Sequence, residues 1–226
     1  MSANPFVGKV TSGGNFSTEI PDADSHHGIL IALIDLGTHE FTFKGKTSKK
    51  RDCVLVWDLT ETEKADGTSH VVCKRYTLSK NLDSALVAAY AKWERKKYNA
   101  DHDFNPLIAL GKPWDIPIEH QTKTKDNKER TYASVGDPGP VRKGVEVAPS
   151  KHCPKPFCFF IGGNVPLPLQ EWLPRVYGDK IEDLIVTSPE WQELEDDHPQ
   201  KVALRKARPA IDDEADNGQD DDAEPF

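Results

Sequence analysis

Two groups of basic side chains could hold the phosphates of a nucleic acid. Residues 44–51 carry five positive charges and no acid, and residues 121–130 are again polar and basic. Two further cations, Lys74 and Arg75, lie between these groups. The candidate cations of the two groups are Lys44, Lys46, Lys49, Lys50, Arg51, Lys123, Lys125, Lys128 and Arg130. A protein that binds single-stranded nucleic acid first requires cations placed along the path of the phosphates.

Aromatic rings are the second requirement, because each base stacked on a ring contributes about 1–3 kcal/mol whatever its sequence. The candidates on predicted strands are Phe41, Phe43, Trp57, Tyr76 and Tyr132. Tyr76 alternates with Lys74 and is the better stacking candidate, whereas Trp57 and Phe43 could equally fill the core. Trp93 lies on the apolar face of a predicted helix, and we expect it in the core.

The sequence offers little support for an enzyme. Gly45-Lys46-Thr47 is not a phosphate loop, because Glu40 occupies the position of its first glycine. His152, Cys153 and Cys158 could ligate a metal, but no fourth ligand is assigned, so free buried thiols are favoured. The motifs of serine hydrolases, zinc proteases and zinc deaminases are absent from the sequence. We therefore expect no catalytic residue, no metal and no cofactor, although scattered carboxylates could still assemble a metal-dependent nuclease site.

The elements that position these residues can be read from the spacing of apolar side chains. The predicted strands cover 28–34 with a continuation at 40–43, 53–57, 71–77, 111–120 and 131–135. Strand 111–120 contains prolines, which favours an edge position. Asn81 could cap a helix that runs to about Tyr98. Residues 44–51 and 121–130 are then exposed basic loops, the second turning at Asp126-Asn127.

Three strands, a helix and two more strands are the order of the five-stranded OB-fold barrel. The fold is therefore predicted to be mainly β, with the helix between strands 3 and 4. In that fold the loops joining strands 1–2 and 4–5 flank the nucleic-acid cleft, which is where both basic loops would lie.

The rest of the chain divides by composition. Eight prolines occur between residues 138 and 174, too many for regular strands or helices, so this segment is predicted to wrap over the barrel. Short helices could form at 169–177 and 189–194. The expected division is a flexible N-terminal arm 1–24, an OB domain 25–137, a Pro-rich extension 138–196 and a disordered acidic tail 197–226.

The net charge of −8 conceals an uneven distribution. Residues 190–226 contain 13 acids and 4 bases, whereas residues 1–189 contain 24 acids and 25 bases. A basic body with an acidic extension is typical of a nucleic-acid-binding protein or of an acidic interaction tail.

The cellular location can also be predicted. No apolar run reaches the roughly 18 residues of a membrane-spanning helix, and residues 1–11 lack the features of a secretory signal. Four scattered cysteines favour a reducing cytoplasm.

The last residues of the chain have the chemistry of a tethered ligand. The final segment is rich in acids and ends in a single aromatic ring beside the terminal carboxylate. A basic pocket on a partner could bind the ring, the carboxylate and the acids. The candidate partner-binding residues are Asp220, Asp221, Asp222, Glu224, Pro225 and Phe226.

This ending resembles the C-terminal tip of bacterial single-stranded DNA-binding proteins, Asp-Asp-Asp-Ile-Pro-Phe, with Ala223-Glu224 in place of Ile. The body resembles a group of phage-encoded single-stranded DNA-binding proteins of the OB type. The residues that carry this second resemblance are Ile34-Asp35-Leu36-Gly37-Thr38, Trp57-Asp58-Leu59, Arg75-Tyr76-Thr77-Leu78-Ser79, Leu110-Gly111-Lys112-Pro113, Leu173-Pro174 and Ser188-Pro189-Glu190.

The resemblance implies that the protein coats exposed single-stranded DNA in replication, recombination or repair. It also implies that the tail recruits a polymerase, helicase, primase or nuclease, and that the tail competes with DNA for the basic cleft. The expected location is the cytoplasm, that of a bacterial host if the protein is phage-encoded, and a homo-oligomer is possible. Two other functions stay open: a metal-dependent single-strand nuclease, and a protein adaptor that binds no DNA.

Overall fold

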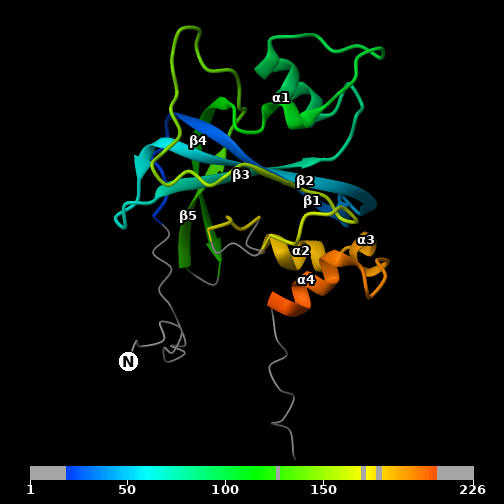
Figure 1. The fold of residues 1–226 in the computed structure, drawn as a ribbon. Helices are drawn as coiled ribbons and strands as arrows, with labels where there is room; N and C mark the ends of the chain where they lie inside the picture. The colour runs from blue at the N-terminus through cyan, green and yellow to red at the C-terminus, as the bar shows by residue number, and fades with distance from the viewer. Residues whose placement is uncertain (1–18, 126–127, 169–171, 177–179, 208–226) are drawn as a thin grey trace, which may run out of the picture.

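A curled antiparallel sheet forms the centre of the molecule (Figure 1). The structure is a computed structural model and describes residues 19–125, 128–168, 172–176 and 180–207. Five strands follow the order β3-β2-β1-β4-β5. They are β1 (Ser25–Phe43), β2 (Lys46–Glu63), β3 (Ser69–Thr77), β4 (Pro113–Lys125) and β5 (Lys128–Val135). Among the described residues no ladder joins β3 to β5, so the sheet is a half-barrel.

The sheet lies between two layers. On one side lies α1 (Ala85–Glu94), followed by a 3₁₀ helix (Pro106–Ala109). On the other side lies a C-terminal layer of three short helices (Figure 1), and it is joined to the sheet by β6, which pairs in parallel with β1. These elements are β6 (Phe157–Phe159), α2 (Ile181–Val186), α3 (Pro189–Gln192) and α4 (Pro199–Ala207).

The strands β1 and β2 bury both of their faces, which is why their sequences are continuously apolar rather than alternating. Trp57, Trp114 and Tyr90 belong to the core on the α1 side and are fully buried. Ile34 and Trp191 belong to a second core, between the sheet and the C-terminal layer. The Pro-rich extension therefore contributes to this second core rather than only covering the surface.

The prediction that residues 44–51 form a basic loop is wrong, because most of these residues belong to a β-strand. The register pairs Phe43 with Lys46, so β1 and β2 are joined by a two-residue turn at Lys44 and Gly45. Both turn residues have positive φ, 49° and 74°, as a tight turn between twisted strands requires. Residues 46–51 thus extend β2 out of the core, and their polarity reflects exposure rather than irregular structure.

The predicted loop 121–130 is likewise mostly strand, since β4 and β5 pair from Ile118 as far as Lys125 and Lys128. The prediction of an edge position for β4 is also wrong. Its first half pairs with β1, up to Ser25 opposite Pro117, and its second half pairs with β5. The prolines are tolerated because one begins the strand and the other lies where the partner strand changes. The turn predicted at Asp126-Asn127 lies outside the described residues.

The predicted helix 81–98 is too long at both ends. Ser84 is the N-cap, and its side chain accepts a hydrogen bond from the Val87 N–H at 3.2 Å. Asn81 instead forms a turn, in which its side chain accepts from the Asp83 N–H. The helix ends at Arg95, which has a left-handed conformation with φ of 55°.

The predictions for the C-terminal half are met only in part. The helix predicted at 189–194 corresponds to α3, but the described residues of 169–177, which are 172–176, form no helix. The helix α2 was not predicted. Disorder was predicted from residue 197 onwards, but α4 occupies Pro199–Ala207. Residues 1–18 and 208–226 lie outside the described residues.

Replacing Gly37 by alanine is expected to destabilise the protein more than the same change at Gly45. Both glycines have positive φ, which costs an alanine about 1–2 kcal/mol. A Cβ at Gly37 would also lie 2.3 Å from the Cβ of Ser188, whereas a Cβ at Gly45 meets no atom within 4 Å. Urea unfolding of the two variants measures the difference, and equal losses of stability would contradict a close packing of Gly37 on Ser188.

Candidate nucleic-acid interface

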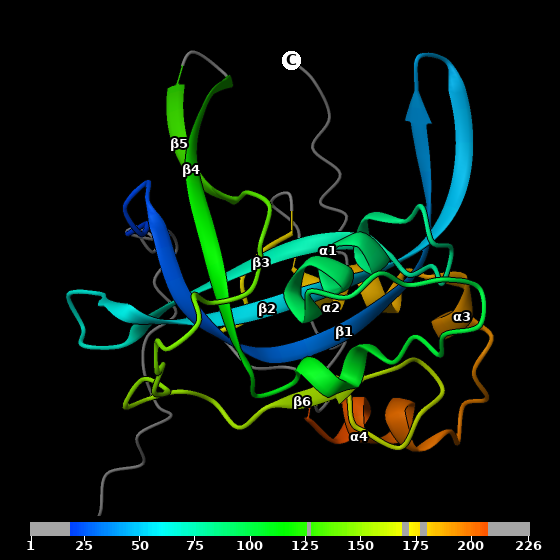
Figure 2. The same ribbon diagram turned by 90° about the horizontal axis from the view of Figure 1, so that it is seen from above.

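Two hairpins project from the sheet in the same direction and stand apart from one another (Figure 2). The first hairpin comprises residues 38–51 of β1, β2 and their turn. The second hairpin comprises residues 119–125 of β4 and 128–134 of β5. These segments hold most of the cations that the sequence singled out, and they place them on strands of defined register.

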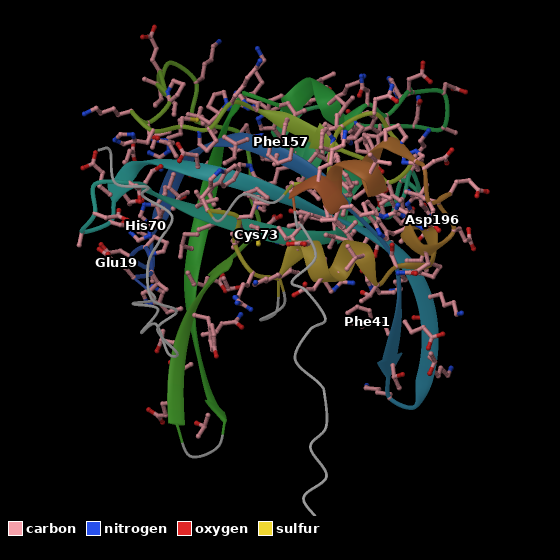
Figure 3. The ribbon with its side chains drawn as sticks, turned by 60° about the horizontal axis from the view of Figure 1, so that its bottom comes forward. Glu19, Phe41, His70, Cys73, Phe157 and Asp196 are labelled. Atoms are coloured by element: carbon pink, nitrogen blue, oxygen red, sulfur yellow. The ribbon has the colours of Figure 1, made fainter. Side chains whose placement is uncertain are left out.

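The two faces of the first hairpin differ. On one face Lys49 forms an ion pair with Glu40 at 3.1 Å, and the hydroxyls of Thr42 and Thr47 lie 3.0 Å apart. The register places Phe41 on the opposite face, because neighbouring strand residues alternate. Phe41, at the edge of this face, is 43% exposed (Figure 3). This face therefore presents a ring to solvent beside Lys46 and Lys50 of β2.

Phe41 is supported from one side by an arginine. The guanidinium carbon of Arg75, on β3, lies 5.2 Å from the centre of the Phe41 ring. Asp52 holds that guanidinium, with 2.8 Å from Asp52 Oδ2 to Arg75 Nε. The Arg75 side chain is only 10% exposed. The arrangement fixes a cation against a ring that is still partly open, which is a geometry suited to stacking.

The second hairpin repeats the pattern of the first. The hydroxyls of Thr122 and Thr131 lie 3.1 Å apart across the strands. Tyr132, the next residue, lies opposite Gln121 and is 45% exposed. The register pairs Lys123 with Arg130 and Lys125 with Lys128, but the side chains of these four residues lie outside what the structure describes. Each hairpin thus carries an exposed aromatic residue next to a threonine pair.

The cations of the first hairpin fall into two groups. Lys44, Lys46, Lys49 and Lys50 are exposed. Arg51, nearer the core, forms an ion pair with Asp35, which is fully buried. The hydrogen bond to Asp35 raises the pKa of Arg51. Arg51, which was predicted to contact DNA, is thus paired within the protein, although its side chain is 40% exposed. Phe43 lies at the hairpin end, and its side chain is outside the described set.

Lys74 and Tyr76 point to the other side of β3 from Arg75 and do not join the hairpin surface. The Lys74 ammonium donates to the carbonyl of Gly136, across the gap between β3 and β5. Burial lowers the pKa of Lys74. Tyr76 is only 4% exposed and belongs to the α1-side core. Burial raises the pKa of the Tyr76 hydroxyl, because burial disfavours the charged form of any group. The ring of Tyr76 is therefore closed to a base, the half-buried Lys74 is used within the protein, and the prediction that they contact DNA finds no support in the hairpin surface.

Trp57 is also a core residue rather than a stacking platform. It is fully buried, and its ring meets that of Trp114 edge-on at 5.9 Å between centroids. Trp93, predicted in the core, stacks on the other side of the same cluster, 5.1 Å from Trp114. The Trp93 indole donates to the carbonyl of Pro113 at 3.0 Å. No ring face of Trp57 is open to a base.

Sequence reasoning missed the role of two residues that hold this surface in place. Asp52 orients Arg75, and Glu190 accepts hydrogen bonds from Thr38 at the base of the first hairpin. Glu190 was singled out only through the resemblance at residues 188–190, and Asp52 was not singled out, because each contact joins segments that are separated along the chain.

Other kinds of site find no support in the described part of the chain. Within it, no group of three or more His, Cys, Asp or Glu side chains is arranged to hold a metal. Cys153 and Cys158 are free thiols. No helix formed by the described residues is long and apolar enough to cross a membrane. The candidate partner-binding residues 220–226 lie beyond those ranges, so their predicted role is untested.

Comparison with known proteins yields no relative: no protein-family model matches the chain, and no curated protein matches its sequence.

Replacing Tyr76 by phenylalanine is expected to leave stability unchanged or to raise it by up to about 1 kcal/mol. The Tyr76 hydroxyl is buried and has no hydrogen-bond partner among the described residues, so its removal relieves a desolvation cost. Chemical denaturation measures the change. A loss of more than about 1 kcal/mol would show that the hydroxyl has a partner.

Proposed function

We propose that this protein binds single-stranded DNA without sequence preference and protects it during replication, recombination or repair. The observation that carries the proposal is the pair of hairpins on one side of the sheet, each with an exposed aromatic side chain, Phe41 or Tyr132. Lysines flank Phe41 on β2, and four further basic residues lie in the strands that hold Tyr132. Stacking on rings and neutralisation of phosphates are the two interactions that such binding needs. The proposal includes no catalytic step.

The strand connections support an OB-type fold as part of this proposal. The strand β1 pairs with both β2 and β4, β4 pairs with β5, and α1 lies in the chain between β3 and β4. In OB-folds the connections between strands 1–2 and 4–5 contact the nucleic acid. The two hairpins are those connections in this chain.

The C-terminal layer restricts where a strand of DNA could lie. It covers the outer face of β1 with Phe159, Ile185 and Trp191, all buried. A base could therefore not stack on that part of the sheet. In a simpler barrel this face is open, and a base can stack on it. In our proposal the DNA instead passes over the two hairpins, with Phe41 and Tyr132 as its stacking contacts.

The acidic C-terminal segment completes the proposal. Residues 212–226 contain eight acids and no base and end in Phe226. We assign to Asp220–Asp222, Glu224, Pro225 and Phe226 the recruitment of replication or recombination proteins, through a basic pocket on the partner.

Titration with oligo-dT across a range of salt concentrations tests the proposed function. Each phosphate neutralised on a single strand contributes about −0.7 to the slope of log K against log salt. Lys46 and Lys50, which the register places on the same face as Phe41, would alone give a slope of about −1.4. Absence of binding would favour the protein adaptor, and cleavage of the oligonucleotide in Mg²⁺ or Mn²⁺ would favour the nuclease. Affinity that does not change with salt would contradict the proposed contacts.

Replacing Phe41 or Tyr132 by alanine is expected to weaken oligo-dT binding by about 1–3 kcal/mol each. The matched control is Leu107→Ala, since Leu107 is exposed to a similar extent, 41%, and belongs to the 3₁₀ helix rather than to a hairpin. Fluorescence anisotropy at one salt concentration compares the three variants. If the control weakens binding as much as the hairpin variants do, the hairpin rings are not stacking contacts.

A further inference from the structure

The base of the first hairpin is attached to the C-terminal layer through α3. The Glu190 carboxylate accepts from the Thr38 N–H at 2.8 Å and also from the Thr38 hydroxyl. Thr38 is the residue at which β1 leaves the core, and Glu190 is 152 positions further along the chain. The backbone N–H and the side-chain hydroxyl of Thr38 thus both donate to the carboxylate of Glu190.

Glu190 is itself held by a rigid support. Ser188 caps α3 by accepting from the Trp191 N–H at 3.3 Å, and Trp191 is buried in the second core. Gly37 packs directly against Ser188, where no larger residue would fit. Partial burial by itself raises the pKa of Glu190. The hydrogen bonds from Thr38 and the charge of Arg51 lower the pKa by more than burial raises it, so the pKa of Glu190 lies below its usual value. The group is therefore charged at neutral pH.

The opposite strand of the hairpin is anchored at its base by a second contact, to Asp35 of β1. Arg51, which lies opposite Thr38 in the register, pairs with Asp35. Asp35 also accepts from the Gly37 N–H at 3.1 Å and from the Ile161 N–H at 3.3 Å. Both strands are thus anchored where they leave the core. Beyond this base, the described strand residues 39–43 and 46–50 pair only with each other.

We propose that Glu190 is a positioning residue for single-stranded DNA binding, which sets the direction of the first hairpin through Thr38. This inference rests on the proposed function. A two-stranded ribbon that leaves a sheet is free to twist and bend about its base. The contacts of Glu190 limit that freedom and so hold Phe41 and the lysines of β2 in one orientation before DNA binds. Pre-organisation of this kind raises affinity because less ordering is needed on binding.

Two substitutions of Glu190 separate its contact from its charge. Glu190→Gln removes the charge but can keep both contacts, since an amide can accept from the Thr38 N–H and donate to the Thr38 hydroxyl. Glu190→Ala removes both charge and contacts. Loss of a negative charge near the lysines should by itself favour DNA, so weaker binding by the alanine variant cannot arise from electrostatics.

The experiment compares wild-type, Glu190→Gln and Glu190→Ala proteins, with Glu193→Ala as control for the loss of an exposed acid at the end of the same helix. Oligo-dT affinity is measured at one salt concentration, and amide hydrogen exchange of residues 38–51 is measured without DNA. We expect Glu190→Ala to bind about tenfold more weakly and to exchange faster from Thr38 outwards. Glu190→Gln and Glu193→Ala should bind at least as tightly as wild type, with little change in exchange.

Different outcomes overturn the two proposals. Equal affinities of Glu190→Ala and Glu190→Gln, or unchanged exchange of residues 38–51 in Glu190→Ala, overturn the positioning role while the proposed function stands. Wild-type protein that fails to bind oligo-dT overturns the proposed function and this inference with it. If Glu190→Ala does not fold, Thr38→Val, which removes only the hydroxyl contact, takes its place and should show a smaller change in the same direction.

Discussion

The pairing of β1 with β2 is the interaction on which the rest of the structure depends. Their central residues are buried on both faces, so this one pair of strands contributes to both hydrophobic cores. A slip of one residue between the strands would exchange the side chains that fill the two cores and would separate Asp35 from Arg51, so the cores and this ion pair together constrain the register. After a shift of one residue between Asp35 and Gly37, the pairing of β1 with β2 continues without a break from Gly37 and Asp52 to the end of the first hairpin. The arrangement of Phe41 and its neighbouring lysines is therefore set by packing that occurs well away from them.

Ion pairs with buried carboxylates lie at the boundary between the core and the projecting surface. Asp35 pairs with Arg51, and Asp52 pairs with Arg75, at the points where β1, β2 and β3 leave the cores. A carboxylate in such a position must be paired, because an unpaired buried charge costs several kcal/mol. The basic residues nearest the core are thereby committed to structure. Those further out, such as Lys46 and Lys50, are the ones that the proposed function uses.

Different parts of the molecule have different roles in our proposal, and the C-terminal layer connects them. It closes the outer face of β1, and Glu190 and Ser188 place it against the base of the first hairpin. In our proposal the sheet supplies rigidity, the hairpins supply the contacts to DNA, and the acidic C-terminal segment supplies the contact to partners. The charges are separated along the sequence in the same way, with basic residues in the hairpins and acids in the C-terminal segment.

Several features of this protein could be predicted from the sequence because they depend on neighbouring residues. The spacing around Trp93 indicated that its ring faces the core, against which it packs partly buried. The apolar runs at 28–34 and 53–57 indicated strands, and the composition of 44–51 indicated an exposed basic segment. Only the tertiary structure decided that this segment is a hairpin, that Trp57 and Tyr76 are buried, and that Arg51 is paired. Register shifts at Leu30/Ala32 and Asp35/Gly37 change which face each β1 residue occupies, and no local pattern marks them. The contact of Thr38 with Glu190 depends on chain segments that meet only when the two cores form.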